Sequence, residues 1–168
     1  MTSDPWKRDG ANGAVLSDCR TYRYALWRQL SGVTETYYGG YCMFIGLNPS
    51  TADEKADDPT IRRCKAFALA WGYQALVMAN LFAFRATDPR VMKAAPDPVG
   101  PANNEWLLGM GEGAGMVVAA WGAHGSHQGR AAAVRNLVPK LHYLRLTKDG
   151  SPGHPLYLPS DLRPQPWH

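Results

Sequence analysis

Four apolar runs of strand length alternate along this chain with segments of helical period, and this alternation limits the possible fold more than any other feature. The runs cover residues 41–47, 75–84, 116–122 and 141–146. The first of them, YCMFIGL, is almost wholly apolar, which is typical of a strand covered on both faces. The pattern predicts an α/β protein, a three-layer α/β/α sandwich around a central, mostly parallel four-stranded sheet.

The length of 168 residues is enough for one well-buried core and too short for two comfortable domains. We therefore expect a single domain over residues 1–168, with roughly the first 15 and the last 10 residues irregular. The stretch TYRYALWRQL, residues 21–30, alternates large and basic side chains. It is predicted to be an edge strand or an amphipathic lead-in to the domain.

A helix is predicted directly after the first apolar run. Asp58 and Pro59 provide a cap and a proline at the first helical position, and Gly72 provides a stop. The spacing of Thr51 and Glu54 also fits a capping box, so a short earlier turn is a second interpretation.

Two further helices are predicted between the later runs. Asn103 or Asn104 would cap the first, which continues through Leu108 after a proline-rich loop. Ser126 would open the second, an alanine-rich segment that Pro139 stops.

Two apparent motifs do not predict a site. The run GMGEGAG, residues 109–115, has its third glycine misplaced for a dinucleotide fingerprint and precedes a strand instead of following one. His124 and His127 stand beside glycines, but no third ligand of suitable spacing follows, so we favour a solvated loop over a metal site.

Composition restricts the possible partners only weakly. The net charge of +4 and the pI of about 9.1 suit a nucleic acid or another phosphate-bearing partner. The cysteines Cys19, Cys42 and Cys64 form no C-x-x-C pair and are expected to be small buried side chains in a reducing cytosol. The polar start and the lack of any run near the roughly 20 apolar residues of a membrane span predict a cytoplasmic protein without a membrane partner.

The first apolar run ends in a turn, at the place where ligands of such sheets usually lie. The residues there are Gly46, Leu47, Asn48, Pro49 and Ser50. Glycine lets a ligand approach the backbone, proline stiffens the turn, and the Asn48 amide offers both a donor and an acceptor. The alternative is a tight turn with Asn48 as a cap.

The second run carries Asn80, an amide that is costly to bury unless it is paired. Asn80 therefore either satisfies a backbone group or contacts the edge of a ligand. Arg85 and Thr87 follow it and are expected on the same rim. After the fourth run, His154 precedes an apolar segment, Leu156 to Leu158, that resembles a wedge for a base stack.

Four segments in this order, GLNPS, NLFAFR, WGAHG and HPLYL, resemble the motifs of the uracil-DNA glycosylase superfamily. GLNPS is similar to the asparagine-containing version found in mismatch-specific glycosylases. The longer signature FIGLNPSTADEKADDPTIRRC, with NLFAFRATDP and HPLY, resembles an uncharacterised bacterial and phage family, the domain of unknown function numbered sixteen forty-three.

The superfamily resemblance implies roles for individual residues. Asn48 would position or polarise the attacking water, Asn80 would bind the Watson–Crick edge of an extruded base, and His154 would stabilise the departing base anion. The segment from Leu156 to Leu158 would fill the gap left in the duplex. No metal and no cofactor would be needed. The remaining base-binding positions would be Gly46, Leu47, Pro49, Ser50 and Phe82.

The charged loop after GLNPS departs from the superfamily pattern. One interpretation is that Thr51, Asp53 and Asp57 reshape the pocket while Arg62 or Arg63 holds a phosphate. The other is that Asp58 caps the helix and the arginines are solvated. The residues expected to contact nucleic acid or phosphate are Arg62, Arg63, Arg85, His124, Leu156 and Tyr157. The candidates for a base-stacking aromatic are Phe67, Phe82, Tyr73 and Tyr157.

The leading hypothesis is a monomeric DNA glycosylase-like enzyme, of the kind used in DNA repair, that flips out a damaged or modified base and hydrolyses its N-glycosidic bond. A uracil-type pyrimidine is the favoured base, and the loop carboxylates also allow a free nucleotide. The alternatives are a nucleic-acid or nucleotide-binding module that keeps the pocket without hydrolysis, and a structural protein of a phage or defence system.

Overall fold

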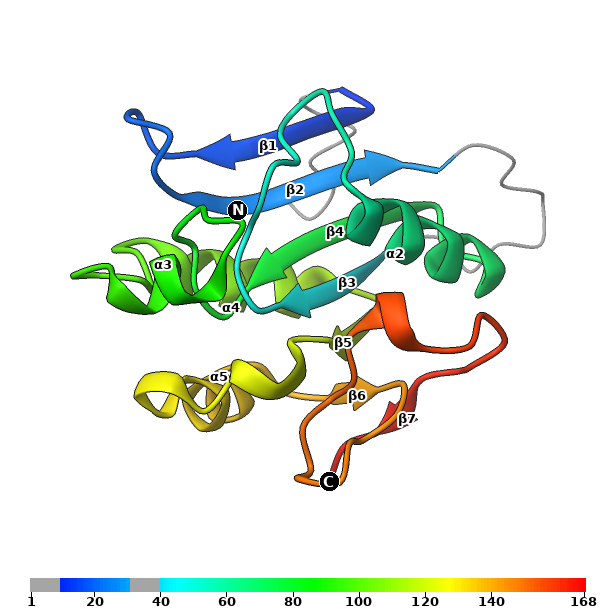
Figure 1. Cartoon of the computed structure of the whole chain (residues 1–168). Coiled ribbons are helices and arrows are strands. Elements are labelled where there is room, and N and C mark those ends of the chain that lie inside the picture. The colour runs from blue at the N-terminus through cyan, green and yellow to red at the C-terminus, as the bar shows by residue number, and fades with distance from the viewer. Residues whose placement is uncertain (1–9, 31–39) are drawn as a thin grey trace.

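A computed structural model describes residues 10–30 and 40–168 of the chain. Its strands form one mixed seven-stranded sheet in the order β1-β2-β4-β3-β5-β6-β7 (Figure 1). The strands are β1 (Asn12–Leu16), β2 (Arg23–Gln29), β3 (Tyr41–Gly46), β4 (Ala75–Asn80), β5 (Met116–Ala119), β6 (Leu141–Tyr143) and β7 (Gln165–Pro166).

The four predicted runs correspond to the parallel centre of this sheet. β3 pairs in parallel with β4 and β5, and β5 pairs in parallel with β6. The predicted four-stranded sheet is nevertheless incomplete, because β1, β2 and β7 extend it by antiparallel pairing. β1 and β7 lie in the ends that were expected to be irregular. The proline in β7 stands at an edge of the sheet, where a missing N–H is tolerated.

The prediction that residues 21–30 form an edge strand or a lead-in is wrong in position. β2 lies between β1 and β4, and the side chains from Arg23 to Arg28 are all buried. Its arginines made the segment look half exposed, but Arg23 and Arg28 both donate hydrogen bonds inside the protein.

The strand predicted over residues 75–84 ends earlier, at Asn80. The backbone then bonds to other segments: Ala83 N–H donates to Val99 O, and Phe84 forms an isolated antiparallel bridge with Tyr22. The chain therefore leaves the sheet immediately after the amide of interest.

The helix predicted from Asp58 is confirmed as α2 (Pro59–Ala70), with the Asp58 carboxylate accepting the Ile61 N–H at 2.9 Å. The other predicted helices are α4 (Asn103–Gly113) and α5 (Arg130–Leu137), and α3 (Pro89–Ala94) was not predicted. Three 3-10 turns are η1 (Gly122–His124), η2 (His127–Gly129) and η3 (Pro155–Tyr157).

The predicted cap of α4 is wrong. The residue before the helix is Ala102, and no side chain caps it. Asn103 is instead the first helical residue, is buried, and donates to the carbonyls of Asn80 and Leu81. α5 also begins later than predicted, because Gly129 adopts a left-handed conformation that interrupts the helix before Arg130.

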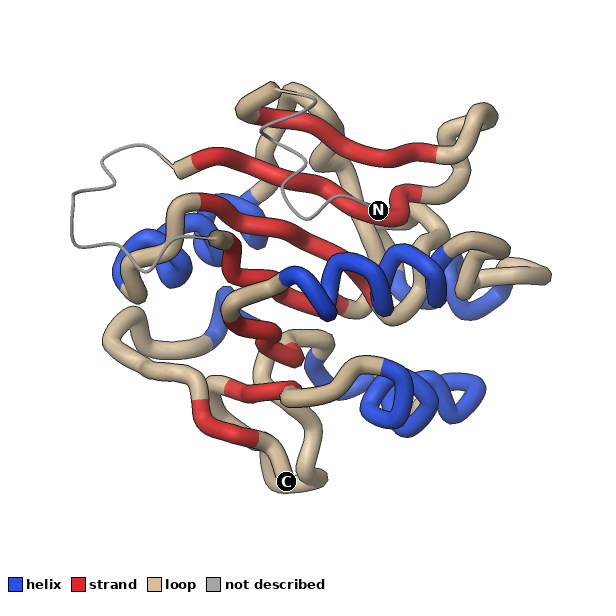
Figure 2. Tube along the Cα trace, turned by 180° about the vertical axis from the view of Figure 1, so that it is seen from behind, coloured by secondary structure: helices blue, strands red, loops and turns tan. Residues whose placement is uncertain are grey.

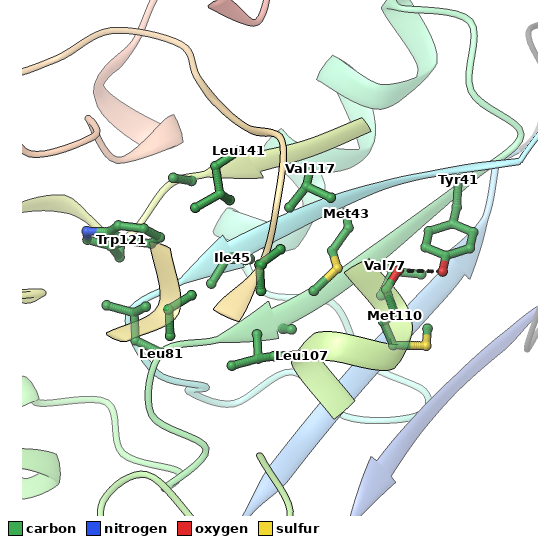
Figure 3. Close-up of a cluster of buried hydrophobic side chains, with 14 of the residues drawn as sticks. Tyr41, Met43, Ile45, Val77, Leu81, Leu107, Met110, Val117, Trp121 and Leu141 are labelled. Atoms are coloured by element: carbon green, nitrogen blue, oxygen red, sulfur yellow. Dashed lines mark hydrogen bonds between the residues drawn. The ribbon is translucent and has the colours of Figure 1, made fainter. Parts of the chain in front are cut away.

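Two apolar clusters lie on opposite faces of the sheet and give the predicted three layers. Alternate residues of β3 point to each face. Met43 and Ile45 pack in the cluster that includes Leu107 of α4 and Val134 of α5, shown partly in Figure 3. Phe44 packs in the other cluster, which α2 covers. Figure 2, seen from behind, shows α4 crossing in front of the sheet, on the face opposite to the one that α2 covers.

The cysteine prediction holds for two of the three residues. Cys42 and Cys64 are fully buried free thiols, whereas Cys19 is exposed in the turn between β1 and β2. Within residues 10–30 and 40–168, no helix is long and apolar enough to cross a membrane.

Candidate functional site

A cavity of about 600 Å³ lies at the carboxyl ends of the parallel strands. Gly46 is the last residue of β3 and Asn80 the last of β4, and Trp121 is the second residue after the end of β5. His154 and Tyr157 approach from η3, so residues far apart in the sequence share one cavity. Each of these strand ends belongs to a segment that was expected from the sequence to contribute to a site.

Asn48 lines the cavity and also ties two loops together. Its Nδ2 donates to Ala86 O at 2.8 Å and lies 3.2 Å from Pro49 O and 3.4 Å from Phe84 O. Asn48 is therefore not a simple turn cap, since it joins the loop after β3 to the loop after β4. With its nitrogen engaged by carbonyls, the group left to face a ligand is the acceptor Oδ1.

Asn80 is 3% exposed and lies between Arg23 and Gly46. Arg23 Nη2 donates to Asn80 Oδ1 at 3.4 Å, and an arginine can only donate, so this contact fixes which end of the amide is oxygen. Nδ2 lies on the other side, where a β-carbon at Gly46 would be 3.2 Å away. Glycine at residue 46 therefore leaves the amide nitrogen room to donate.

His154 contributes a donor of defined tautomer. Its Nδ1 accepts the Leu156 N–H at 3.2 Å, so the proton of the neutral ring is on Nε2. Burial lowers the pKa of His154 below its ordinary value, and the nearby Asp58 carboxylate opposes part of that effect. The imidazole is therefore neutral at pH 7.

Arg23 is a cavity residue that the sequence analysis missed. It is 3% exposed, and Nη1 donates to Ala52 O at 2.9 Å while Nε has no partner among the described residues. Burial lowers the pKa of Arg23 to about 10, so the guanidinium stays charged at neutral pH. The basic positions in residues 21–30 were the available signal, but the alternation was taken as surface exposure.

One carboxylate stands among the described residues that line the cavity. It belongs to Asp58, the N-cap of α2, and Thr60 and Ile61 continue the wall from there. Asp58 is half-buried, and its negative charge acts on both Arg23 and His154. The cavity therefore combines a positive and a negative group with neutral polar side chains, Asn48, Asn80 and His154 among them.

The rim carries apolar and polar side chains from several loops. Leu156 and Tyr157 are 41% and 84% exposed, and the Tyr157 ring centroid lies 5.6 Å from that of His154. On another part of the rim, Lys93 Nζ lies 3.0 Å from His124 Nδ1. Ser50 also lines the cavity, and its hydroxyl lies 3.3 Å from that of Thr87.

The charged loop is held from behind by Arg28 of β2. Its Nε donates to Asp57 Oδ1 at 2.7 Å, and Nη2 donates to the carbonyls of Asp53 and Ala56. The Asp53 carboxylate folds the loop on itself by accepting two backbone N–H groups, at Lys55 and Ala56. Thr51, Asp53 and Asp57 are not among the residues that line the cavity, so only Asp58 brings loop charge to it.

The arginines proposed as phosphate ligands do not line the cavity either. Arg63 donates to the carbonyls of Pro155 and Leu158, Arg62 donates to Asp57 O, and Arg85 donates to Arg20 O. Arg63 thus links α2 to the backbone around η3 by hydrogen bonds.

Of the aromatic residues predicted to stack on a base, most lie outside the cavity. Phe82 and Phe67 are core residues, Tyr73 is 9% exposed and buried among the residues that α2 covers, and Tyr157 reaches the cavity. Trp121 was not predicted as a stacking residue. Apart from the imidazoles, it and Tyr157 provide the aromatic rings of the described cavity lining. Its ring centroid lies 5.7 Å from that of Trp167.

Among the described residues, no three His, Cys, Asp or Glu side chains gather as metal ligands would. A protein-family model matches residues 23–156, a span that holds every cavity residue named above except Tyr157, and its description is "Protein of unknown function (DUF1643)". No curated protein and no solved structure matches the chain significantly.

Proposed function

We propose that this chain, which belongs to the DUF1643 family of proteins of unknown function, is a DNA glycosylase-like hydrolase. It would take a flipped-out damaged or modified base, or the base of a nucleotide, into the strand-end cavity and hydrolyse the N-glycosidic bond. We further propose that the fold is of the uracil-DNA glycosylase type.

The observation that carries the proposal is the meeting of Asn48, Asn80 and His154 in one cavity. These residues belong to three segments that resemble glycosylase motifs. A volume of about 600 Å³ lies within the range of small-molecule sites, roughly 300–1,000 Å³, and suits a base with part of its sugar.

The hydrogen-bonding pattern favours a base with oxo groups. Asn80 Nδ2 and His154 Nε2 are donors, and Asn48 Oδ1 is an acceptor, for the reasons given above. A pyrimidine with two carbonyl oxygens, such as uracil, complements two donors. An amino group would meet Asn80 Nδ2 donor to donor, so cytosine would be disfavoured.

In this proposal the base leaves with the bonding electron pair, and the neutral His154 stabilises the resulting negative charge by donating from Nε2. Leu156 and Tyr157, exposed at the rim, would occupy the space that the base vacates in a duplex. Flipping costs a few kcal/mol, and it costs least at a mismatched or damaged base.

The test measures base release from duplex and single-stranded oligonucleotides that carry uracil, hypoxanthine, thymine mismatches or hypermodified pyrimidines, and from free nucleotides. His154→Asn keeps an acceptor for the Leu156 N–H but loses the ring donor, and we expect kcat to fall about 10²- to 10³-fold. Asn80→Asp keeps an oxygen for Arg23 but loses the Nδ2 donor, so we expect it to abolish the preference for oxo bases.

Full activity in both variants would contradict the site assignment. Binding of a base without release from any substrate would favour the second candidate, a non-hydrolytic binding module. The engagement of the Asn48 nitrogen by three carbonyls is the observation that favours that candidate, because it gives Asn48 a structural role without catalysis.

A further inference from the structure

General base catalysis of hydrolysis in the cavity requires a group that accepts a proton from water, and neither Asn48 nor His154 supplies one. Asn48 is an amide, which does not take up a proton at ordinary pH. His154 cannot accept through Nδ1, because that nitrogen already accepts the Leu156 N–H, and its Nε2 carries the proton. The residues to which the superfamily resemblance assigns catalytic roles therefore include no base.

Asp58 is the carboxylate in the described cavity wall. Its Oδ1 accepts the Ile61 N–H at 2.9 Å, and no described residue donates a hydrogen bond to its Oδ2. The cap bond fixes the orientation of the carboxylate and leaves one oxygen free. The residue is only half-buried, so water can reach it.

The charged and titratable groups near Asp58 come from three elements. Arg23 approaches from β2, His154 from the start of η3, and Cys64 from the next turns of α2. The Arg23 guanidinium is positive, while the imidazole and the Cys64 thiol are neutral at pH 7. Asp58 therefore has one positive and two neutral groups among these neighbours.

We propose that Asp58 is the general base of the cavity, an inference that rests on the proposed hydrolase function. The oxygen of water forms a bond to C1′ of the sugar as the bond from C1′ to the base nitrogen breaks, and the electron pair leaves with the base. The proton released from water passes to Asp58 Oδ2. The base anion takes up a proton from solvent, and Asp58 releases its own to solvent, so water and substrate give free base and free sugar hydroxyl.

The test uses Asp58→Asn, because asparagine caps a helix about as well as aspartate. We expect Asp58→Asn to unfold at the same urea concentration as the wild type, with kcat lowered about 10²- to 10⁴-fold and KM little changed. Asp58→Ala is the control that also loses the cap, so it should lose stability as well as activity.

A binding measurement separates charge from structure. Oligonucleotides carry either a cationic pyrrolidine or a neutral tetrahydrofuran in place of the substrate sugar. The wild type should bind the cationic oligonucleotide more tightly, and Asp58→Asn should lose this preference while binding the neutral one as before.

The outcomes distinguish the two proposals. A wild type that releases base, together with an equally active Asp58→Asn, overturns the role of Asp58 and leaves the hydrolase proposal intact. A wild type that releases no base from any substrate, and binds both oligonucleotides alike, overturns both proposals. Loss of rate and of the preference for the cationic oligonucleotide in a stable Asp58→Asn supports both.

Discussion

At the scale of single residues, Arg28 does the most to hold the charged loop in place. Its guanidinium donates to the Asp57 carboxylate and to the carbonyls of Gly13, Trp27, Asp53 and Ala56, and its side chain is 2% exposed. Removal of a buried charged group whose donors are all engaged is strongly destabilising, because its partners then remain buried without hydrogen bonds.

We expect Arg28→Leu to lower the free energy of unfolding by about 3–5 kcal/mol, as for a broken buried ion pair. The matched control is Lys65→Ala, which removes the more exposed partner of Asp57, 3.0 Å away, and should cost less than about 1 kcal/mol. Urea unfolding measures both. Equal losses in the two variants would show that Arg28 does not anchor the loop.

The same ion pair predicts how stability depends on pH. Burial alone would raise the pKa of Asp57, but the hydrogen bonds from Arg28 and Lys65 outweigh it and lower the pKa below its ordinary value. The native state therefore binds this proton less readily than the unfolded chain, so the stabilisation is complete above the unfolded pKa of about 4 and is lost as pH falls through the lower native value.

We expect this loss in urea unfolding of the wild type between pH 5 and pH 2, and a flatter dependence over the same range in Asp57→Asn. Identical curves for the two proteins would argue against a lowered pKa at Asp57.

Residues with charges inside the protein were the hardest to predict from sequence. Asn48 and His154 follow apolar runs, where ligands of such sheets usually lie, and Asn80 stands out as an amide inside one, so all three could be found from the sequence. Arg23 and Arg28 precede those runs, and their partners at Ala52 and Asp57 come from a distant loop. Such pairing depends on tertiary contacts that periodicity does not report.

At the scale of elements, η3 follows its cap residue His154 and is linked to α2 by Arg63. Arg63 donates to the carbonyls of Pro155 and Leu158, and its guanidinium lies 5.1 Å from the centroid of the Phe67 ring. These two hydrogen bonds join Arg63 to both ends of η3, so they restrain the segment that presents His154 to the cavity.

We expect Arg63→Ala to weaken base binding and slow base release by about tenfold, through loss of positioning, with no change in the salt dependence of DNA binding, because a residue that contacts no phosphate releases no counterion. The neighbouring Arg62→Ala, an exposed position, is the control. A shallower salt slope in Arg63→Ala alone would restore the phosphate interpretation.

Elements were predictable where their signals are local. α2 has its cap, its proline and its apolar face in consecutive sequence, and the prediction of its start was correct. α3 is only six residues long, too short for a periodic pattern to show. α4 was predicted with an asparagine cap, but the Asn103 side chain donates instead to the carbonyls of Asn80 and Leu81 at the end of β4. This long-range contact overrides the local capping preference of asparagine.

At the scale of the whole molecule, the parallel centre of the sheet was predictable and its borders were not. β3 to β6 are apolar runs separated by helices, which indicates parallel pairing. β1 is five residues with a glycine, and β7 is two residues with a proline, so neither carries a strand signal. Both are strands only because a neighbouring strand offers free backbone groups.

The cavity draws its walls from β2, near one end of the described chain, and from η3, near the other. During synthesis, the ribosome releases Arg23 long before His154, so a nascent chain without His154 lacks part of the cavity wall. Contacts between such distant segments are the slowest to form, because closing the long intervening loop costs entropy before any contact repays it. Ligand binding should therefore be among the last properties that a newly made chain acquires.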